Sequence, residues 1–252
     1  MLPVVRDAAR PVTDAARCHA AGMTRALVVG ASSDIGGAIA ADRAAAGQEV
    51  VLWGRDGARL HATAERCGGR ATVALVDVTD HGRVRTALDQ VLDGGPLHTV
   101  VYAAGTFDWA PADRADPAAW QRLLDVNLTA AAVLTTMVLP PLLEAAPSAL
   151  VYVGSGAGRR AYANNAAYVA SKHGLAGLAW ATFLDVRDRD VKVSVVSPGL
   201  VAAGAGLWSP AGQERPEELL SPADVAAAVR FVVDFPANGC PVEVELQPQR
   251  TP

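Results

Sequence analysis

Short apolar runs alternate with longer alanine-rich segments along most of the chain. The apolar, β-branched runs that predict strands are 26–30, 49–53, 71–76, 99–103, 149–153, 191–196 and 242–246. The segments with helical spacing between them are roughly 34–46, 56–66, 81–93, 116–138, 163–187 and 222–234. Strands that alternate with helices of this length predict right-handed crossovers and a parallel sheet. Because the strand runs are apolar throughout, helices are expected to cover both faces of that sheet.

These elements predict one doubly wound α/β domain over residues 23–252, with no repeat or low-complexity linker dividing it. Residues 1–22 differ, because they contain Pro3 and Pro11 and lack the apolar core of a signal peptide. We expect this segment to lie outside the fold. An upstream start codon explains it more simply than a functional arm does.

Composition narrows the class of protein. The chain has 252 residues, of which 51% are hydrophobic and 19% charged, with a formal net charge of -4. This balance excludes a disordered chain and gives no broad basic surface for nucleic acid. No apolar run free of charge and proline reaches the roughly 18 residues of a membrane span. The three cysteines, Cys18, Cys67 and Cys240, form no disulfide or zinc pattern, so we expect a cytoplasmic protein without a metal site.

A small-residue turn, Gly30 to Gly37, follows the first predicted strand. In a doubly wound sheet, ligands bind beyond the carboxyl ends of the strands. Small residues there allow the backbone to approach a pyrophosphate, which the N-terminus of the next helix attracts. The alternative is a tight turn without a ligand.

The second predicted strand ends without the acidic residue that typically binds the ribose of NAD. Arg55 follows it instead, and a guanidinium pairs well with a 2′-phosphate. This pattern favours NADPH over NADH. The alternative is a solvated Arg55 beside a helix capped by Asp56.

Ser155, Tyr168 and Lys172 give the strongest chemical signal. Tyr168 and Lys172 are four residues apart on a predicted helix, so their side chains leave the same face. A nearby ammonium favours the phenolate and is expected to lower the pKa of Tyr168 toward neutrality. Ser155, at the end of the fifth strand, is placed to hydrogen-bond a carbonyl oxygen beside the phenol.

With these residues, the chain resembles the short-chain dehydrogenase/reductase family over residues 24–247, which implies a Rossmann-type fold. Tyr168 to Lys172 matches the family's YxxxK motif, Ser155 precedes it at the usual distance, and Asn127 matches the asparagine of the catalytic tetrad. Asp34 replaces the middle glycine of the family's glycine-rich motif, and Ala203 replaces a threonine that often holds the carboxamide, so backbone groups of Leu200 and Val201 would have to hold it. The cofactor-binding residues that the resemblance and the reasoning above imply are Gly30, Ser32, Ser33, Asp34, Ile35, Gly36, Arg55, Asp77, Val78, Ala104, Gly105, Tyr168, Lys172, Pro198, Gly199 and Val201.

The resemblance implies hydride transfer from NADPH to a small or medium hydrophobic ketone, such as one of secondary metabolism, with Tyr168 as proton donor. Lys172 would also bind the nicotinamide ribose, and Asn127 would maintain a helix irregularity and an ordered water, unless it is only a helix cap. Ser155 would orient the substrate, unless it is only a turn hydroxyl. Redox-neutral chemistry, such as dehydration or epimerisation, and a nucleotide sensor without turnover remain alternatives.

Further expectations concern the substrate and assembly. Residues 202–220 predict a lid, and Phe107 and Trp109 are candidates to line the same cleft. Arg159 and Arg160 could attract an anionic substrate, or could be ordinary surface residues. The resemblance also implies a homodimer or homotetramer whose main contact contains Ala170 and Gly174, unless the small residues of these helices pack on their own sheet. The small residues concerned are Ala130, Ala131, Ala132, Ala166, Ala167, Ala170, Gly174 and Gly177.

Overall fold

The strands of the chain align side by side in one sheet. The computed structural model describes residues 24–250, so the expected extension at 1–22 lies outside the described residues. The strands are β1 (Arg25–Val29), β2 (Glu49–Gly54), β3 (Ala71–Leu75), β4 (Thr99–Tyr102), β5 (Ser148–Val153), β6 (Val191–Pro198) and β7 (Glu243–Leu246). The α-helices are α1 (Asp34–Ala45), α2 (Gly57–Arg66), α3 (His81–Asp93), α4 (Pro117–Leu124), α5 (Ala130–Glu144), α6 (Ala166–Val186), α7 (Pro210–Glu214) and α8 (Pro222–Val233).

The strand order is β3-β2-β1-β4-β5-β6-β7, and all six neighbouring pairs are parallel. The predicted doubly wound α/β sheet is thereby confirmed. The chain order reverses between β1 and β4, which places the switch point, and hence the expected ligand crevice, beyond the carboxyl ends of these two strands.

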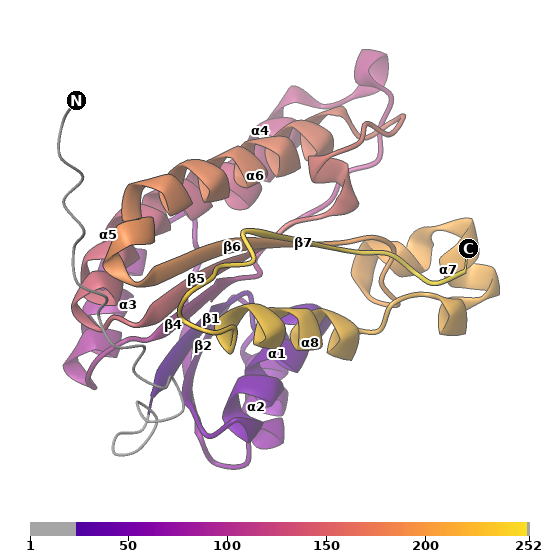
Figure 1. The fold of residues 1–252 in the computed structure, drawn as a ribbon. Helices are drawn as coiled ribbons and strands as arrows, with labels where there is room; N and C mark the ends of the chain where they lie inside the picture. The colour runs from indigo at the N-terminus through magenta and orange to yellow at the C-terminus, as the bar shows by residue number, and fades with distance from the viewer. Residues whose placement is uncertain (1–23, 251–252) are drawn as a thin grey trace, which may run out of the picture.

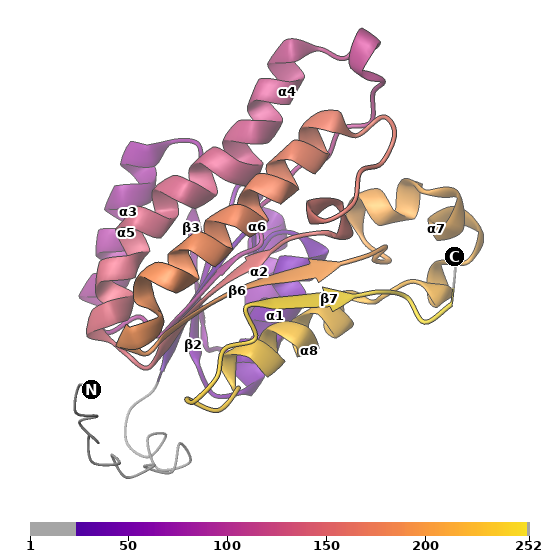
Figure 2. The ribbon, with the colours of Figure 1, turned by 45° about the horizontal axis from the view of Figure 1, so that its top comes forward.

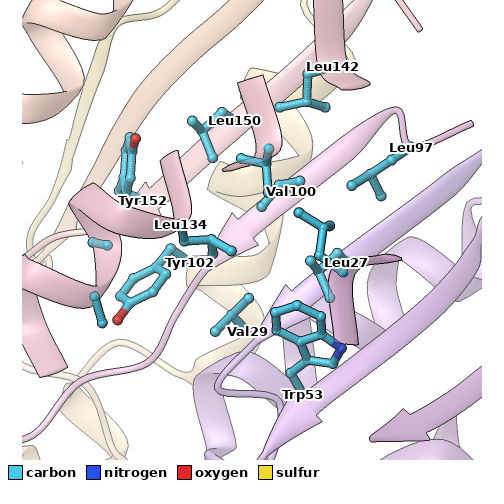
Figure 3. Close-up of a cluster of buried hydrophobic side chains, with 14 of the residues drawn as sticks. Leu27, Val29, Trp53, Leu97, Val100, Tyr102, Leu134, Leu142, Leu150 and Tyr152 are labelled. Carbon is cyan, nitrogen blue, oxygen red and sulfur yellow. The ribbon is translucent and has the colours of Figure 1, made fainter. Parts of the chain in front are cut away.

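Helices cover both faces of the sheet, as Figures 1 and 2 show. One hydrophobic core lies between the sheet and α3, α5 and α6, and the other between the sheet and α1, α2 and α8. Successive strand residues alternate between them, since Val100 and Tyr102 belong to the first core and Val101 to the second. Figure 3 shows the first core, where Trp53 and Tyr102 are among the largest fully buried side chains.

The long helix predicted at 116–138 is interrupted and extended. A π-helical turn, η3 (Asp125–Thr129), separates α4 from α5, and the Ala130 N–H donates to the carbonyl oxygen of Asp125. α5 then continues past Pro140 and Pro141 to Glu144, although proline usually ends a helix. Leu142 is fully buried in the core, so packing outweighs the hydrogen bonds that the prolines cannot make.

The run Pro117–Glu144 is long and apolar enough to cross a membrane by length and composition. A core helix of a soluble protein passes the same test. Here the buried residues of the run, among them Leu134 and Val138, pack against the sheet. The apolar residues of the run that face the sheet thus belong to the hydrophobic core.

Candidate active site

A cleft that is open to solvent lies at the predicted switch point. It is lined by the end of β2, by the turns that follow β1, β2, β3 and β4, and by the π-helical turn. The lining residues are Gly30, Ser32, Ser33, Gly54, Arg55, Val76, Asp77, Val78, Ala103, Ala104, Gly105 and Val126. Eight of the sequence-predicted cofactor residues lie together here: Gly30, Ser32, Ser33, Arg55, Asp77, Val78, Ala104 and Gly105.

The turn after β1 has no room for larger residues. Gly30 has a φ of +89°, and a Cβ atom there would lie 2.5 Å from the backbone nitrogen of Ala104. A Cβ on Gly36 would lie 2.2 Å from the carbonyl oxygen of Gly30. Ser33 caps α1 by accepting a hydrogen bond from the Gly36 N–H at 3.0 Å. The turn therefore brings bare backbone and a helix N-terminus to the cleft, which fits a dinucleotide phosphate.

Asp34, the departure from the family's glycine, is the first residue of α1 and not its cap. Its carboxylate lies 2.6 Å from the guanidinium of Arg59 on α2. Neither side chain lines the cleft. The negative charge at this helix terminus is therefore paired with a cation, which reduces the repulsion that it would exert on a bound pyrophosphate.

Arg55 and Asp77 lie at the far end of the cleft, with their charged atoms 3.8 Å apart. Hydrogen bonds from Thr79, and then the charge of Arg55, hold the pKa of Asp77 below its ordinary value. The Arg55 side chain is mostly exposed, and exposed ion pairs contribute little free energy. Its guanidinium is consequently available to an incoming anion.

Asn127 lies in the π-helical turn and is completely buried. Its side-chain oxygen accepts from the Thr106 N–H at 2.8 Å, and its amide nitrogen donates to the Thr106 carbonyl at 2.9 Å and to Ser171 Oγ at 3.1 Å. The helix irregularity expected at this residue is present, and Asn127 is not a helix cap. Tyr102, which sequence reasoning did not single out, supports the turn by donating to the Val126 carbonyl at 2.6 Å.

Ser155, Tyr168 and Lys172 come together between the end of β5 and α6. A hydrogen bond joins the Ser155 and Tyr168 side chains, and Lys172 Nζ lies 5.7 Å from the centre of the Tyr168 ring. Lys172 Nζ also donates to the Val153 carbonyl at 3.1 Å. A Cβ added at Gly105 would lie 3.7 Å from Lys172 Nζ and 3.6 Å from Asn127 Oδ1, so this glycine leaves open space beside both groups. The four residues expected to be catalytic, Asn127, Ser155, Tyr168 and Lys172, thus lie close together beyond the carboxyl ends of the strands.

Burial shifts the pKa of both titrating groups in this cluster. It raises the pKa of Tyr168, an effect that the hydrogen bond with Ser155 partly offsets. Burial lowers the pKa of Lys172 to about 8. The expected lowering of the Tyr168 pKa by Lys172 is therefore not found in the ligand-free chain, because desolvation of the phenol dominates. Near neutral pH, Tyr168 holds a proton that it can donate and Lys172 is mostly charged.

The remaining predicted cofactor residues lie outside the lining of the cleft. Asp34, Ile35 and Gly36 form the first turn of α1. Pro198 ends β6, whose Val196 pairs with Val153 of β5, and Gly199 donates its N–H to the Leu246 carbonyl. Val201 forms a bridge with Leu220 that closes the base of the predicted lid. The carbonyl oxygens of Leu200 and Val201 already accept hydrogen bonds within the chain, from Leu220 and Ala203.

Arg159 and Arg160 are both paired with carboxylates of β7. Arg159 forms a two-point ion pair with Glu243, and Arg160 lies 2.8 Å from Glu245. The pair with Glu243 raises the pKa of Arg159 further above its ordinary value. Sequence reasoning did not identify these partners, which are 84 and 85 residues away. The anion-binding hypothesis loses its main support, since neither charge is uncompensated.

The lid segment approaches Tyr168 through aromatic residues. It contains the 3-10 turn η6 (Gly204–Trp208) and α7, which Figure 1 shows near the C-terminal end of the chain. Phe107 packs against the Tyr168 ring with centroids 5.0 Å apart, and its ring also lies 6.4 Å from that of Trp208 and 6.2 Å from that of Trp109. The expected proximity of Phe107, Trp109 and the lid is present. Within residues 24–250, no group of three or more potential His, Cys, Asp or Glu ligands could hold a metal ion.

A glycine-lined cleft at the switch point of a parallel sheet, next to a Ser-Tyr-Lys-Asn cluster, is the arrangement typical of an oxidoreductase with a Rossmann-type fold. The family model described as short chain dehydrogenase matches residues 24–210. The chain therefore belongs to the short-chain dehydrogenase family and is an enzyme of that class.

Similar proteins of known activity agree with this assignment. The chain is 32% identical over 224 residues to a cis-4-hydroxycyclohexanecarboxylate dehydrogenase of Sinomonas cyclohexanicum, covering 84% of this chain and 90% of that protein. It is 30% identical to sulfoacetaldehyde reductase 2 of Chromohalobacter salexigens, covering 89% of this chain and 94% of that one. A variant of actinorhodin polyketide ketoreductase, solved with NADPH, has a similar fold, with a TM-score of 0.81 and 24% identity over 89% of this chain and 95% of that chain.

Proposed function

We propose that the chain catalyses the NADPH-dependent reduction of a hydrophobic ketone to an alcohol. The observation that carries this proposal is the partly buried Tyr168 phenol, which hydrogen-bonds Ser155 and has the Lys172 ammonium 5.7 Å from the centre of its ring. The cluster lies beyond the ends of the same parallel sheet whose switch point holds the glycine-lined cleft. A proton donor, an orienting hydroxyl and a cation next to such a cleft suit carbonyl reduction.

In this mechanism the Ser155 hydroxyl hydrogen-bonds the ketone oxygen and holds it beside the Tyr168 phenol. NADPH, when bound, supplies the hydride that the carbonyl carbon accepts. Tyr168 donates its proton to the developing alkoxide, which yields the alcohol and leaves a phenolate. The Lys172 ammonium stabilises that phenolate, and it would also hold the nicotinamide ribose. Asn127, through Thr106 and Ser171, fixes the neighbouring backbone so that these groups keep their positions.

Cofactor preference is proposed from the cleft. Gly30, Gly36 and the capped N-terminus of α1 suit the pyrophosphate, and Gly105 leaves space beside Lys172 for the nicotinamide ribose. Arg55 would pair with the 2′-phosphate in place of its weak pair with Asp77. We also propose a cytoplasmic location, which suits the described cysteines, Cys67 and Cys240, since both are free thiols.

The test mixes purified protein with NADPH and a panel of hydrophobic ketones and follows nicotinamide absorbance. We expect oxidation of NADPH that depends on ketone, with the alcohol as product. Tyr168→Phe should reduce turnover by more than about a hundredfold while NADPH still binds, because only the acid is removed. Binding of NADPH without its oxidation would instead indicate a nucleotide sensor. Substrate conversion without net NADPH consumption would indicate redox-neutral chemistry.

A further inference from the structure

The loop that carries Phe107 is fixed at both of its ends. At its start, the backbone N–H and carbonyl of Thr106 are both hydrogen-bonded by the Asn127 side chain, at 2.8 and 2.9 Å. At its end, the Ala110 N–H donates to the carbonyl of Asn164 at 2.9 Å. Phe107 therefore lies on a short segment tied to the π-helical turn and to the residues that precede α6. Its position relative to Tyr168 is set by backbone hydrogen bonds on two sides.

Phe107 is also the centre of an aromatic cluster, which we define as Phe107, Trp109, Tyr168 and Trp208. Phe107 meets Tyr168 at an interplanar angle of 72° and Trp208 at 63°, both edge-to-face arrangements. The two tryptophans remain 63% and 68% exposed. Large aromatic surface next to the proposed proton donor is thus left in contact with water, and a bound apolar ring would cover it.

The charges around the cluster disfavour an anionic substrate. Arg159 and Arg160, on the loop between Ser155 and α6, are both neutralised by carboxylates of β7. Asp108 lies between Phe107 and Trp109 in the sequence and adds a carboxylate to the same loop. A substrate carboxylate or phosphate would therefore find no uncompensated cation in this arginine pair, and the loop of Phe107 itself carries a carboxylate and no cation.

We propose that Phe107 is a specificity-determining residue that selects uncharged ketones in which the carbonyl is attached to a ring, over open-chain ketones of the same size. The substrate ring would take edge-to-face contacts with Phe107 and with Trp208 of the lid, which directs its carbonyl toward Tyr168. This inference rests on the proposed ketone reduction and adds the class of ketone.

The test compares kcat/KM for acetophenone with that for 2-octanone, which has the same number of carbon atoms, with NADPH as reductant. The wild-type protein should prefer acetophenone. Phe107→Leu keeps an apolar side chain without a ring, and should lower that preference about threefold to tenfold, the size of one ring–ring contact. The change should appear mainly in KM for acetophenone, while kcat for 2-octanone is retained. Phe107→Tyr, which keeps the ring, should retain the preference.

Phe231→Leu is the matched control, because Phe231 is a half-exposed phenylalanine on α8 whose ring packs on Phe235 and not on this cluster. Each variant is checked for its wild-type melting temperature. If Phe107→Leu does not fold, Trp208→Leu replaces it, since this exposed lid residue contributes the second ring contact. The same loss of preference is expected.

The outcomes separate this inference from the proposed function. Reduction of both ketones with no preference, or a preference unchanged in Phe107→Leu and Trp208→Leu, would overturn the role of Phe107 and leave ketone reduction intact. Faster turnover of 4-acetylbenzoate than of acetophenone would overturn the selection of uncharged substrates. Absence of NADPH oxidation with every ketone would overturn the proposed function, and this inference with it.

Discussion

Lys172 is a buried lysine, and burial lowers its pKa to about 8. An unfolded lysine has a pKa of about 10.4, so the unfolded chain binds this proton more tightly than the folded chain does. The buried ammonium therefore destabilises the fold below about pH 8, and the penalty is relieved as pH rises from about 8 toward 10.4.

We accordingly expect Lys172→Met to unfold at a higher urea concentration than the wild type near pH 7. Its advantage should shrink above about pH 8, by up to about 1.4 kcal/mol per pH unit, because the wild type gains stability there. Urea unfolding at about pH 7 and about pH 9.5 measures both effects. Lys192→Met is the comparison variant. Burial also lowers the pKa of Lys192, but this lysine is only half-buried, so its variant should show a smaller change of stability with pH. If the difference in unfolding free energy between Lys172→Met and the wild type were the same at both pH values, Lys172 would not titrate between them.

Arg55 decides the choice between the two nicotinamide cofactors in this proposal. Its pair with Asp77 is long and exposed, so replacing that contact by a 2′-phosphate costs little. A charged hydrogen bond to phosphate contributes roughly 1.5–3 kcal/mol, which is about ten- to a hundredfold in affinity. Arg55→Ala should weaken NADPH binding by that factor and leave NADH binding almost unchanged. Fluorescence titration with each cofactor measures this, with Arg83→Ala as a surface control on α3. Equal weakening of both cofactors would exclude a 2′-phosphate contact.

At the scale of single elements, the π-helical turn between α4 and α5 depends on Tyr102 at the end of β4. The phenol donates to the Val126 carbonyl, one residue before Asn127. Tyr152 on the next strand is a matched control, because its buried hydroxyl bonds Thr135 at 2.6 Å, away from the turn. Both Tyr102→Phe and Tyr152→Phe should lose about 1 kcal/mol of stability, the net contribution of one hydrogen bond.

Only Tyr102→Phe should also lower kcat, because only this hydroxyl supports the backbone that carries Asn127. Its KM for NADPH should stay close to that of the wild type. Denaturant unfolding measures the loss of stability in the two variants, and steady-state kinetics measures kcat and the KM for NADPH. If both variants lost activity to the same degree, the effect would be one of general stability and not of the turn.

The same elements show what the sequence can predict. Most strand runs are recognisable because they are apolar and β-branched, whereas β7 alternates two glutamates with Val244 and Leu246. The sheet order follows from crossovers that leave little choice of topology. The turn glycines and the Tyr168–Lys172 spacing are local patterns, so the site could be located from them. The π-helical turn leaves no mark in the spacing of 116–138, so the irregularity at Asn127 could be expected only from the family resemblance and not from the residue pattern. The ion pairs of Asp34, Arg159 and Arg160 also escape sequence analysis, because their partners are distant in the chain.

At the scale of the whole molecule, the small residues of α5 and α6 divide between two roles. Ala130, Ala131 and Ala167 are buried in the chain itself, as the alternative to a subunit contact expected. Gly174 packs within the chain too, because a Cβ there would lie 2.7 Å from Leu128. A larger side chain at this position would also press on Leu128 inside the protomer, so the subunit contact at Gly174 stays a prediction that a substitution there does not test cleanly.

The outward face of α6 carries exposed Ala166, Ala170, Gly177, Trp180 and Leu184. This spacing follows one side of a helix and includes two large apolar side chains, which a partner of matching shape would cover. We therefore still propose a homodimer or homotetramer, with a contact that contains Ala170 and Gly174 and extends along this face to Gly177. Closed twofold symmetry would place this face of α6 against its own copy.

Gly177→Arg tests the contact without disturbing the protomer, since no atom lies within 4 Å of a Cβ at this position. An arginine there would place a charged, bulky side chain in the centre of the apolar face. In a twofold dimer, the arginines of the two protomers would also face each other and repel. Light scattering at micromolar concentration should give a multiple of 26.0 kDa for the wild type and a smaller species for Gly177→Arg. Gly82→Arg on α3 introduces the same side chain where the nearest atom to the Cβ is 3.5 Å away, and should leave the assembly intact. A wild-type mass of one chain would rule out the oligomer, and an unchanged assembly in Gly177→Arg would place the contact on another face.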